Sequence, residues 1–486
     1  MEPGCEVEEA VEVVDIPPMT TTARPARPLD RFIVEGPLRR AVWMLAWPTM
    51  VQNFIGGLQG MVDHALVGHL VGYAGNAAIG VAIQIYIVVI VFVMSVFSGM
   101  GVLVSRFAGA NEPEKVNRAV YQAFLAAIVL WGLVLAPLGW VLAPSLLGLV
   151  HASTVVRAQA LPFLRIIFVG SVGTLFFFMV SGALRAAGDP RTPLRLGILF
   201  TVLNIACNVA FITGLGPLPR LGTAGAAVGT TVAGLVVSGF AVYLLFSGSL
   251  PVTWHRGMDW RPDWGVIRAL FRFGLPTGIQ GIAMNVAGVM LLRFIGSLTQ
   301  SAEAQAAYAV SYTELFSFIT WTSVGLMGAA ATVAGQNLGA QRPDRAVAGV
   351  HVAAGIGLGL AASIGVLFLT IPRVLLGLFG MTDPGVVAIG VQLLAFLSIS
   401  GLFVTVALTY TGGLQGTGDT RSPLYISIVS QIVVPLGICA LIQSTRGLRP
   451  VDIWTAILLG HITRCALSVL RFRQGKWRTI TVEVTR

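Results

Sequence analysis

Charged residues are scarce in this chain. Only 11% of its 486 residues are Asp, Glu, Lys or Arg, whereas 55% are hydrophobic and the mean hydropathy is +0.83. Most of the surface of such a chain cannot face water, so the composition excludes a water-soluble fold. The lipid bilayer is the solvent that fits. We therefore expect an all-α polytopic membrane protein.

Cysteines and nucleotide- or metal-binding motifs are also scarce or missing. The four cysteines, Cys5, Cys207, Cys439 and Cys465, have neither disulfide nor metal spacing. The chain has no P-loop, no His-Glu-x-x-His sequence and no paired intramembrane aspartates. No enzyme activity, no cofactor and no resident metal are therefore expected. ATP is excluded as the energy source.

The net charge of +10 is not gathered into a basic patch. Lys and Arg lie in short segments between apolar runs, a pattern that sets membrane topology and does not indicate a nucleic-acid partner. The first residues lack the basic and apolar regions of a secretory signal. Residues 1–36 are acidic and then rich in Pro and Arg, so they are expected to form a disordered tail.

One stretch occurs twice. Residues 181–194 (SGALRAAGDPRTPL) and 411–424 (TGGLQGTGDTRSPL) agree at 7 of 14 positions and lie 230 residues apart. Each joins two apolar runs through a Gly-Asp turn, and a Pro follows near the start of the second run. The sequences around Pro48 and Pro276 repeat at an offset of 228. A repeat this long is half a protein, and duplicated halves are typical of secondary transporters.

Apolar runs long enough to span a bilayer predict twelve helices, six in each half. They cover residues 40–66, 77–105, 118–142, 158–186, 193–214, 223–247, 266–296, 304–336, 347–371, 385–415, 423–443 and 452–472. The predicted units are a bundle at 37–247, a linker at 248–265, a second bundle at 266–473 and a tail at 474–486. About 23 Lys and Arg fall on one side of the membrane and about seven on the other, which predicts cytoplasmic termini.

These features resemble the multidrug and toxic compound extrusion (MATE) family. The resemblance is carried by the twelve spans in two halves, by the paired Gly-Asp loops and by the GQNLGA run at 335–340, and it covers about residues 38–470. It implies a V-shaped pair of six-helix bundles that exports organic cations or other amphiphiles in exchange for inward H⁺ or Na⁺.

Asp63 is one of two acidic residues well inside predicted spans, where a carboxylate is costly and a functional candidate. At 100° per residue, Gln52, Gln59 and Asp63 fall within about 40° of one another and form a polar stripe. A carboxylate facing the bundle interior could be protonated when water is excluded and ionised when water enters. The alternative is that Asp63 is solvated at the helix end beside His64 and His69.

Asn204 and Asn208 are four residues apart on the predicted helix 193–214 and share a face near the depth of Asp63. Carboxamide oxygens could bind Na⁺ or hydrogen-bond an acid in either protonation state. The family resemblance implies that Asp63, Asn204 and Asn208 form the H⁺ or Na⁺ site of the first half. Some members carry Asp at the position of Asn208, so Na⁺ coordination is less certain here. Hydrogen bonding between helices is the alternative.

Glu314 is the second buried acid expected, with Phe318 and Trp321 on its face and Gln84 as its counterpart in the first half. An acid flanked by aromatic rings suits a cationic amphiphile. The alternative is a hydrogen-bonded glutamic acid that locks two helices. A branch of the family carries further acids, but the matching positions here hold Met284 and Val404.

The matched prolines Pro48 and Pro276 predict kinks that would let each bundle bend, or static packing kinks. The charged residues of the repeated stretch are expected to make loop and cap contacts and not to bind substrate: Arg185, Asp189, Arg191, Asp419 and Arg421.

The function predicted is a secondary active antiporter for amphiphilic or cationic drugs and toxins, working by alternating access between the two bundles. A flippase for lipid-linked sugars, or a dedicated metabolite exporter, is the alternative, and a wider, more cationic cavity would favour it. The partners expected are small amphiphiles and the bilayer of a bacterial inner membrane. A monomer suffices, because both halves are in one chain.

Overall fold

The computed structural model describes residues 31–150, 153–255 and 257–482, and every regular element among them is a helix. The first half contains α2 (Leu38–Leu70), α3 (Tyr73–Gly109), the span Pro113–Leu149 made of α4, the π-helix η1 and α5, then α6 (Thr154–Ala186), α7 (Arg191–Thr213) and α8 (Thr223–Phe246). The second half contains α9 (Trp264–Gly296), the span Ser301–Gly339 made of α10, the π-helix η2 (Ala309–Leu315) and α11 (Ser317–Gly339), then α12 (Pro343–Thr370), α14 (Pro384–Gly416), the span Arg421–Thr445 made of α15, η3 and α16, and α17 (Pro450–Arg473).

Within the described residues these are twelve long helical spans, as the sequence predicts, and three short helices accompany them. The short ones are α1 (Phe32–Glu35), α13 (Pro372–Leu378) and η4 (Lys476–Thr479). Eleven of the long spans are apolar enough to cross a membrane by composition. The twelfth, α2, is 33 residues long but carries Asn, Gln, Asp and His side chains that lower its hydropathy. Those polar groups therefore need a protein environment.

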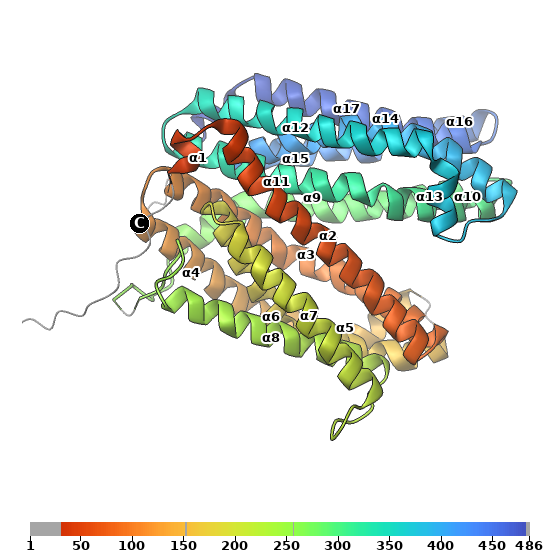
Figure 1. Cartoon of the computed structure of the whole chain (residues 1–486), viewed down its shortest axis with the longest axis horizontal. Helices are drawn as coiled ribbons and strands as arrows, with labels where there is room; N and C mark the ends of the chain where they lie inside the picture. The colour runs from red at the N-terminus through yellow and green to blue at the C-terminus, as the bar shows by residue number, and fades with distance from the viewer. Residues whose placement is uncertain (1–30, 151–152, 256, 483–486) are drawn as a thin grey trace, which may run out of the picture.

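The six spans of each half form a lobe, and the two lobes make a V (Figure 1). The lobes meet at the end that carries α1 and the last described residues, and they diverge toward the end that carries α10 (Ser301–Tyr308) and α13. We call these the closed end and the open end. The helices α2 and α3 of the first lobe pack against α9 and α11 of the second. Both prolines predicted to kink their helices, Pro48 and Pro276, lie inside helices that continue past them.

The repeat is visible in backbone geometry at the closed end. Gly188 and Gly418 have φ of +100° and +97°, a region that favours glycine, and they lie 230 residues apart. Each precedes an aspartate that caps the next helix. Asp189 accepts hydrogen bonds from the backbone N–H and hydroxyl of Thr192, and Asp419 does the same with Ser422. The predicted cap role of both aspartates is thus observed.

Glycines allow the two lobes to touch at the closed end. A Cβ on Gly109 of α3 would lie 1.9 Å from the carbonyl oxygen of Gln336 on α11. A Cβ on Gly339 of α11 would lie 2.1 Å from the carbonyl oxygen of Arg106 on α3. Both pairs are related by the 230-residue repeat, so one contact occurs twice about a local two-fold axis. Only glycine permits this backbone approach.

Both described ends of the chain cross to the opposite lobe. The carbonyls of Ile33 and Val34 in α1 accept hydrogen bonds from Arg345 and Arg342, which stand at the start of α12. The carbonyl of Ile480, after η4, accepts one from Arg106 of α3. These contacts strap the lobes together at the closed end.

The straps differ from the disordered tail expected over 1–36, and they add ordered structure to the tail expected over 474–486. Residues 1–30 and 483–486 lie outside the described residues. Phe32–Glu35 is helical and Ile33 is fully buried, while Trp477 in η4 is 1% exposed and donates its indole N–H to Phe472. Apolar burial and these hydrogen bonds order two short segments in which composition alone predicts no ordered structure. The linker expected at 248–265 does separate α8 from α9.

Candidate functional site

Asp63 lies in the interior of α2, seven residues before the helix ends at Leu70. Its carboxylate oxygen Oδ1 accepts a hydrogen bond of 2.8 Å from Nδ2 of Asn208 on α7. Asn208 is 1% exposed, so this bond lies inside the first lobe. The carboxylate is thus not free in a loop. His64 instead pairs with Asn76 of α3 at 2.6 Å.

Asn208 is the centre of a polar network between α2, α7 and α8. Its Nδ2 also donates to Oδ1 of Asn204 at 3.1 Å, and Nδ2 of Asn204 donates to the hydroxyl of Thr230 on α8 at 2.9 Å. The structure therefore brings together Asp63, Asn204 and Asn208, which the sequence had placed on two separate helices. The carbonyl oxygen Oδ1 of Asn208 is buried and has no hydrogen-bond partner. An unpaired buried acceptor beside a carboxylate is a ready ligand for a cation or a proton donor.

Two residues of this network escape the sequence patterns. Thr230 accepts from Asn204 and donates to the Ala226 carbonyl, and Gly229 packs directly over Asn208. A Cβ at Gly229 would lie 2.2 Å from Oδ1 of Asn208. The only sequence signal is the Gly-Thr-Thr run at 229–231 within an apolar helix. The stripe residue Gln59 joins the same region through a 2.7 Å hydrogen bond from Thr201.

Glu314 lies in the π-helix η2 and is partly buried. In the described part of the chain its carboxylate makes no hydrogen bond or ion pair, so it does not lock two helices. π-Helical turns are frequent at functional sites. Gln84, its counterpart in the repeat, is exposed on α3 and its side chain has no hydrogen bond among the described residues. The two residues do not form a matched pair of sites.

Phe318 and Trp321 lie between the lobes instead of forming a wall of the second half alone. Their rings pack with Phe54 of α2, at centroid distances of 5.7 Å and 5.4 Å respectively. Trp321 occupies the space left by Gly57, and its carbonyl accepts from Asn53 at 3.1 Å. This aromatic cluster joins the middle of α2 to the first turns of α11.

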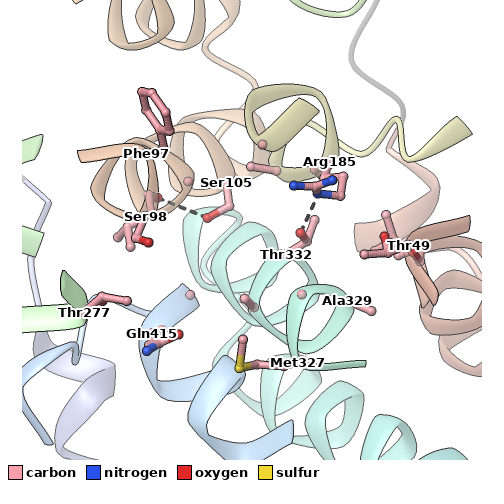
Figure 2. A pocket seen from close by; sticks show the side chains of 18 of the residues that line it. Thr49, Phe97, Ser98, Ser105, Arg185, Thr277, Met327, Ala329, Thr332 and Gln415 are labelled. Atoms are coloured by element: carbon pink, nitrogen blue, oxygen red, sulfur yellow. Dashed lines mark hydrogen bonds between the residues drawn. The ribbon is translucent and has the colours of Figure 1, made fainter. Parts of the chain in front are cut away.

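A cavity of about 330 Å³ lies between the lobes, between this level and the closed end. Its lining comes from both halves and follows the repeat, with these matched residues facing it: Thr49 and Thr277, Phe97 and Met327, Arg185 and Gln415, Pro190 and Thr420. Figure 2 shows Arg185 on one side of the cavity and Thr277 and Gln415 on the other. The cavity therefore straddles the local two-fold axis.

Arg185 departs from the loop role expected of it. Its Nη1 donates a 3.0 Å hydrogen bond to Oε1 of Gln52, another residue of the α2 stripe. In the second half, Nε2 of Gln415 donates to Oε1 of Gln280 at 3.2 Å, the same contact in the repeat. The helix α6 continues to Ala186, so Arg185 is the last turn of a helix and its side chain reaches inward. The polar stripe of α2 thus contacts two regions. Gln52 contacts Arg185 at the cavity, whereas Gln59 and Asp63 contact the polar network.

The polar network and the interlobe cavity are suited to binding an ion and enclosing a ligand, and not to covalent catalysis. In the described ranges, no cluster of three or more His, Cys, Asp or Glu could hold a metal ion. A single carboxylate with amide partners can exchange a proton or a monovalent cation as its hydration changes. An interlobe cavity whose walls belong to two rigid bundles can be exposed to either side in turn.

Comparison with known proteins agrees with the fold. The MatE family model matches residues 48–210 and 276–441, once in each half. The Probable multidrug resistance protein NorM of Thermotoga maritima is 27% identical over 448 residues, covering 90% of this chain and 93% of its own. The protein of the same name from Deinococcus radiodurans is 29% identical over 443 residues, covering 89% and 94%.

Solved structures show the same architecture. The outward-facing conformation of a multidrug resistance MATE family transporter superposes with a TM-score of 0.84 at 19% identity, covering 92% of this chain and 98% of that one. At this identity the likeness establishes the fold alone. The family model, by contrast, spans more than half of the sequence. The chain therefore belongs to the MATE family of membrane transporters, which are not enzymes.

Proposed function

We propose that this protein is a secondary active antiporter that exports amphiphilic or cationic organic compounds in exchange for inward H⁺ or Na⁺. The observation that carries the proposal is the Asp63 network, in which a membrane-embedded carboxylate accepts a hydrogen bond from Nδ2 of Asn208, whose own carbonyl oxygen has no partner. A buried acid is costly in a membrane and is retained where an ion must bind and leave. The names of the relatives, multidrug resistance proteins, support the substrate class.

Alternating access follows from the V. The asymmetry of Lys and Arg supports a cytoplasmic closed end and cytoplasmic termini, in a bacterial inner membrane. In this state the lobes are closed toward the cytoplasm and open outward. Binding of the ion at Asp63 would favour release of the substrate outward, and reopening at the other end would load the next one. No cofactor is needed, and one chain supplies both lobes, so a monomer suffices.

A test is uptake of a fluorescent organic cation into energised everted vesicles, where export from the cytoplasmic side appears as uptake, under separate pH and Na⁺ gradients. We expect wild type to respond to one gradient, which identifies the ion, and Asp63→Asn to respond to neither. Glu314→Gln is the matched control for removing a membrane carboxylate outside the network. It should keep the response to the gradient and weaken only the binding of the cation. Normal coupled efflux by Asp63→Asn would contradict the proposal.

One observation favours a second candidate, a flippase or dedicated metabolite exporter. The only charged side chain lining the interlobe cavity, among the described residues, is the cation Arg185. If no organic cation moves under either gradient, while a lipid-linked or anionic compound does, this candidate replaces the first.

A further inference from the structure

The interlobe cavity holds a positive charge without a negative partner. Arg185 lines it, and none of the described carboxylates forms an ion pair with its guanidinium. One N–H, on Nη1, is used by Gln52 at 3.0 Å. Thr332 donates to the backbone carbonyl of Arg185 and leaves the guanidinium untouched (Figure 2). A guanidinium has five N–H donors, so most of its capacity remains for a ligand.

The repeat shows that the hydrogen bond to α2 does not require a cation. In the second half the neutral amide of Gln415 makes the same bond to Gln280, at 3.2 Å. A glutamine at residue 185 could therefore brace α6 against α2. An arginine adds a partly buried charge between the lobes, and such a charge costs free energy unless an anion or water offsets it. The asymmetry between Arg185 and Gln415 thus needs a reason beyond packing.

The rest of the cavity supplies what an amphiphile needs. Its volume of about 330 Å³ is at the lower end for small-molecule sites, and Met94, Phe97 and Phe178 give it apolar walls. The hydroxyl of Thr277, opposite Arg185, is buried and has no partner. A second polar group is therefore available across the cavity.

We infer that this cavity contains an anion-binding subsite centred on Arg185, which takes the carboxylate or phosphate group of an amphiphilic ligand. The guanidinium pairs with the anion, Thr277 or Gln415 hydrogen-bonds the ligand across the cavity, and the apolar body lies against the aromatic and Met side chains. The inference rests on the proposed transport function, because the cavity is treated as part of the substrate path. It adds that accepted substrates include amphiphiles with an anionic group.

Equilibrium binding to the full chain in nanodiscs tests this without any gradient. The probes are dansyl-undecanoic acid and its methyl ester, which differ in one charge. Charge-assisted hydrogen bonds contribute about 1.5–3 kcal/mol, so we expect wild type to bind the acid at least about tenfold more tightly than the ester. Arg185→Gln, which copies the residue of the second half, should abolish the preference, and Arg185→Lys should keep part of it.

The control is Arg191→Gln, which removes the same charge from an exposed side chain six residues away and should leave the preference intact. If Arg185→Gln does not fold, Gln415→Arg tests the same claim by gain. Gln415→Arg should bind the acid about tenfold more tightly than wild type does, and its affinity for the ester should equal that of wild type. Equal affinity of wild type for acid and ester, or a preference that survives in Arg185→Gln, would overturn the inference.

Competition identifies the source of the anion. Displacement of the acid by dioctanoyl phosphatidate, but not by dioctanoylglycerol, assigns the subsite to a lipid head group. Displacement by decanoate alone assigns it to small amphiphilic acids. Both results support the subsite. The binding assay needs no ion gradient, so it can fail independently of the transport assay. If wild type shows no preference for the acid while Asp63→Asn loses coupled efflux, the anion subsite is refuted and the antiporter proposal stands.

Discussion

Asn208 is the residue on which the proposed ion site depends. It holds the Asp63 carboxylate with its N–H, while its own carbonyl oxygen stays unpaired under Gly229. Any change that turns this carboxamide alters both groups at once. The geometry of the proposed site therefore depends also on Gly229, which has no side chain but leaves room for the carboxamide of Asn208.

Gly229→Ala should therefore impair ion coupling. The added methyl group would lie 2.2 Å from Oδ1 and 2.7 Å from the backbone nitrogen of Asn208, so the carboxamide that bonds Asp63 cannot keep its position. Overpacking of this kind costs about 1–3 kcal/mol. We expect a lower melting temperature in detergent and at least about a tenfold loss of gradient-driven efflux, from the lost hydrogen bond to a charged group.

The matched control is Gly239→Ala on the same helix, where a Cβ meets nothing within 4 Å. It should change neither readout. If both alanine variants transport equally well, the carboxamide of Asn208 does not set the coupling.

Part of the candidate site can be predicted from the sequence. Helical periodicity places Gln59 and Asp63 on one stripe and Asn204 with Asn208 on one face, and the structure joins the two. The sequence does not reveal Gly229, because a glycine that makes room leaves no chemical signature. It assigns Arg185 to loop and cap contacts, because the Gly-Asp turn follows so closely, although the expected span at 158–186 and α6 both include this residue. The direction of the side chain, from the last turn of α6 into the cavity, is what the sequence does not show.

At the scale of elements, the contact between α3 and α11 closes one end of the V. Gly109 and Gly339 make the same backbone approach twice, so both helices must carry glycine at matched positions. The helix spans themselves follow from hydropathy. Their ends do not, because the span expected at 118–142 extends to Pro113–Leu149. The added turns lie at both ends of the expected span. Their backbone hydrogen bonds continue the helix beyond the residues that hydropathy selects.

Gly109→Ala should open the closed end. The new methyl group would lie 1.9 Å from the Gln336 carbonyl oxygen, a backbone atom that cannot move alone. The helices must separate, and the population should shift toward a state open at that end. The measurement is the distance between spin labels on Arg191→Cys and Arg421→Cys, at the helix starts that follow the two Gly-Asp turns, with the four native cysteines replaced.

We expect a longer distance than in the parent. Gly80→Ala, on the same helix with its nearest neighbour at 3.9 Å, should leave the distance unchanged. A distance distribution in Gly109→Ala identical to that of the parent would show that the glycine contact does not hold the closed end.

Trp477→Ala should weaken the strap formed by η4. The indole is 1% exposed, stacks on Phe472 at 5.0 Å and donates to its carbonyl at 2.8 Å. Replacing a buried Trp by Ala typically costs about 3–5 kcal/mol. Thermal unfolding in detergent should show the loss. The comparison is Trp264→Ala, whose side chain is 76% exposed and should cost no more than about 0.5 kcal/mol. Equal melting temperatures would mean that the strap adds nothing.

At the scale of the whole molecule, the duplicated sequence explains the two lobes, and the structure adds how they are joined. The 230-residue repeat predicts two similar six-helix halves and matched turns, and both are observed. The ordered straps could not be predicted, because single buried side chains such as Ile33 and Trp477 decide them within polar segments. The proposed sites lie where the halves differ, since Asp63 has no acidic counterpart and Gln415 occupies the position of Arg185 in the second half.

We propose that the coupling ion binds in the first lobe alone, away from the cavity that both lobes share. In an antiporter the ion and the substrate favour different states, so binding of one must displace the other. This reciprocity can be measured at equilibrium, without a membrane gradient. It tests the link between Asp63 and the substrate directly.

The decisive measurement is the ion released when an organic cation such as tetraphenylphosphonium is added to purified protein. A weakly buffered pH indicator reports H⁺, and bound ²²Na⁺ reports Na⁺. The account predicts that the wild type releases one of these ions and that Asp63→Asn, with substrate still bound, releases neither. Equal release from the wild type and Asp63→Asn would contradict it and move the coupling site elsewhere in the protein.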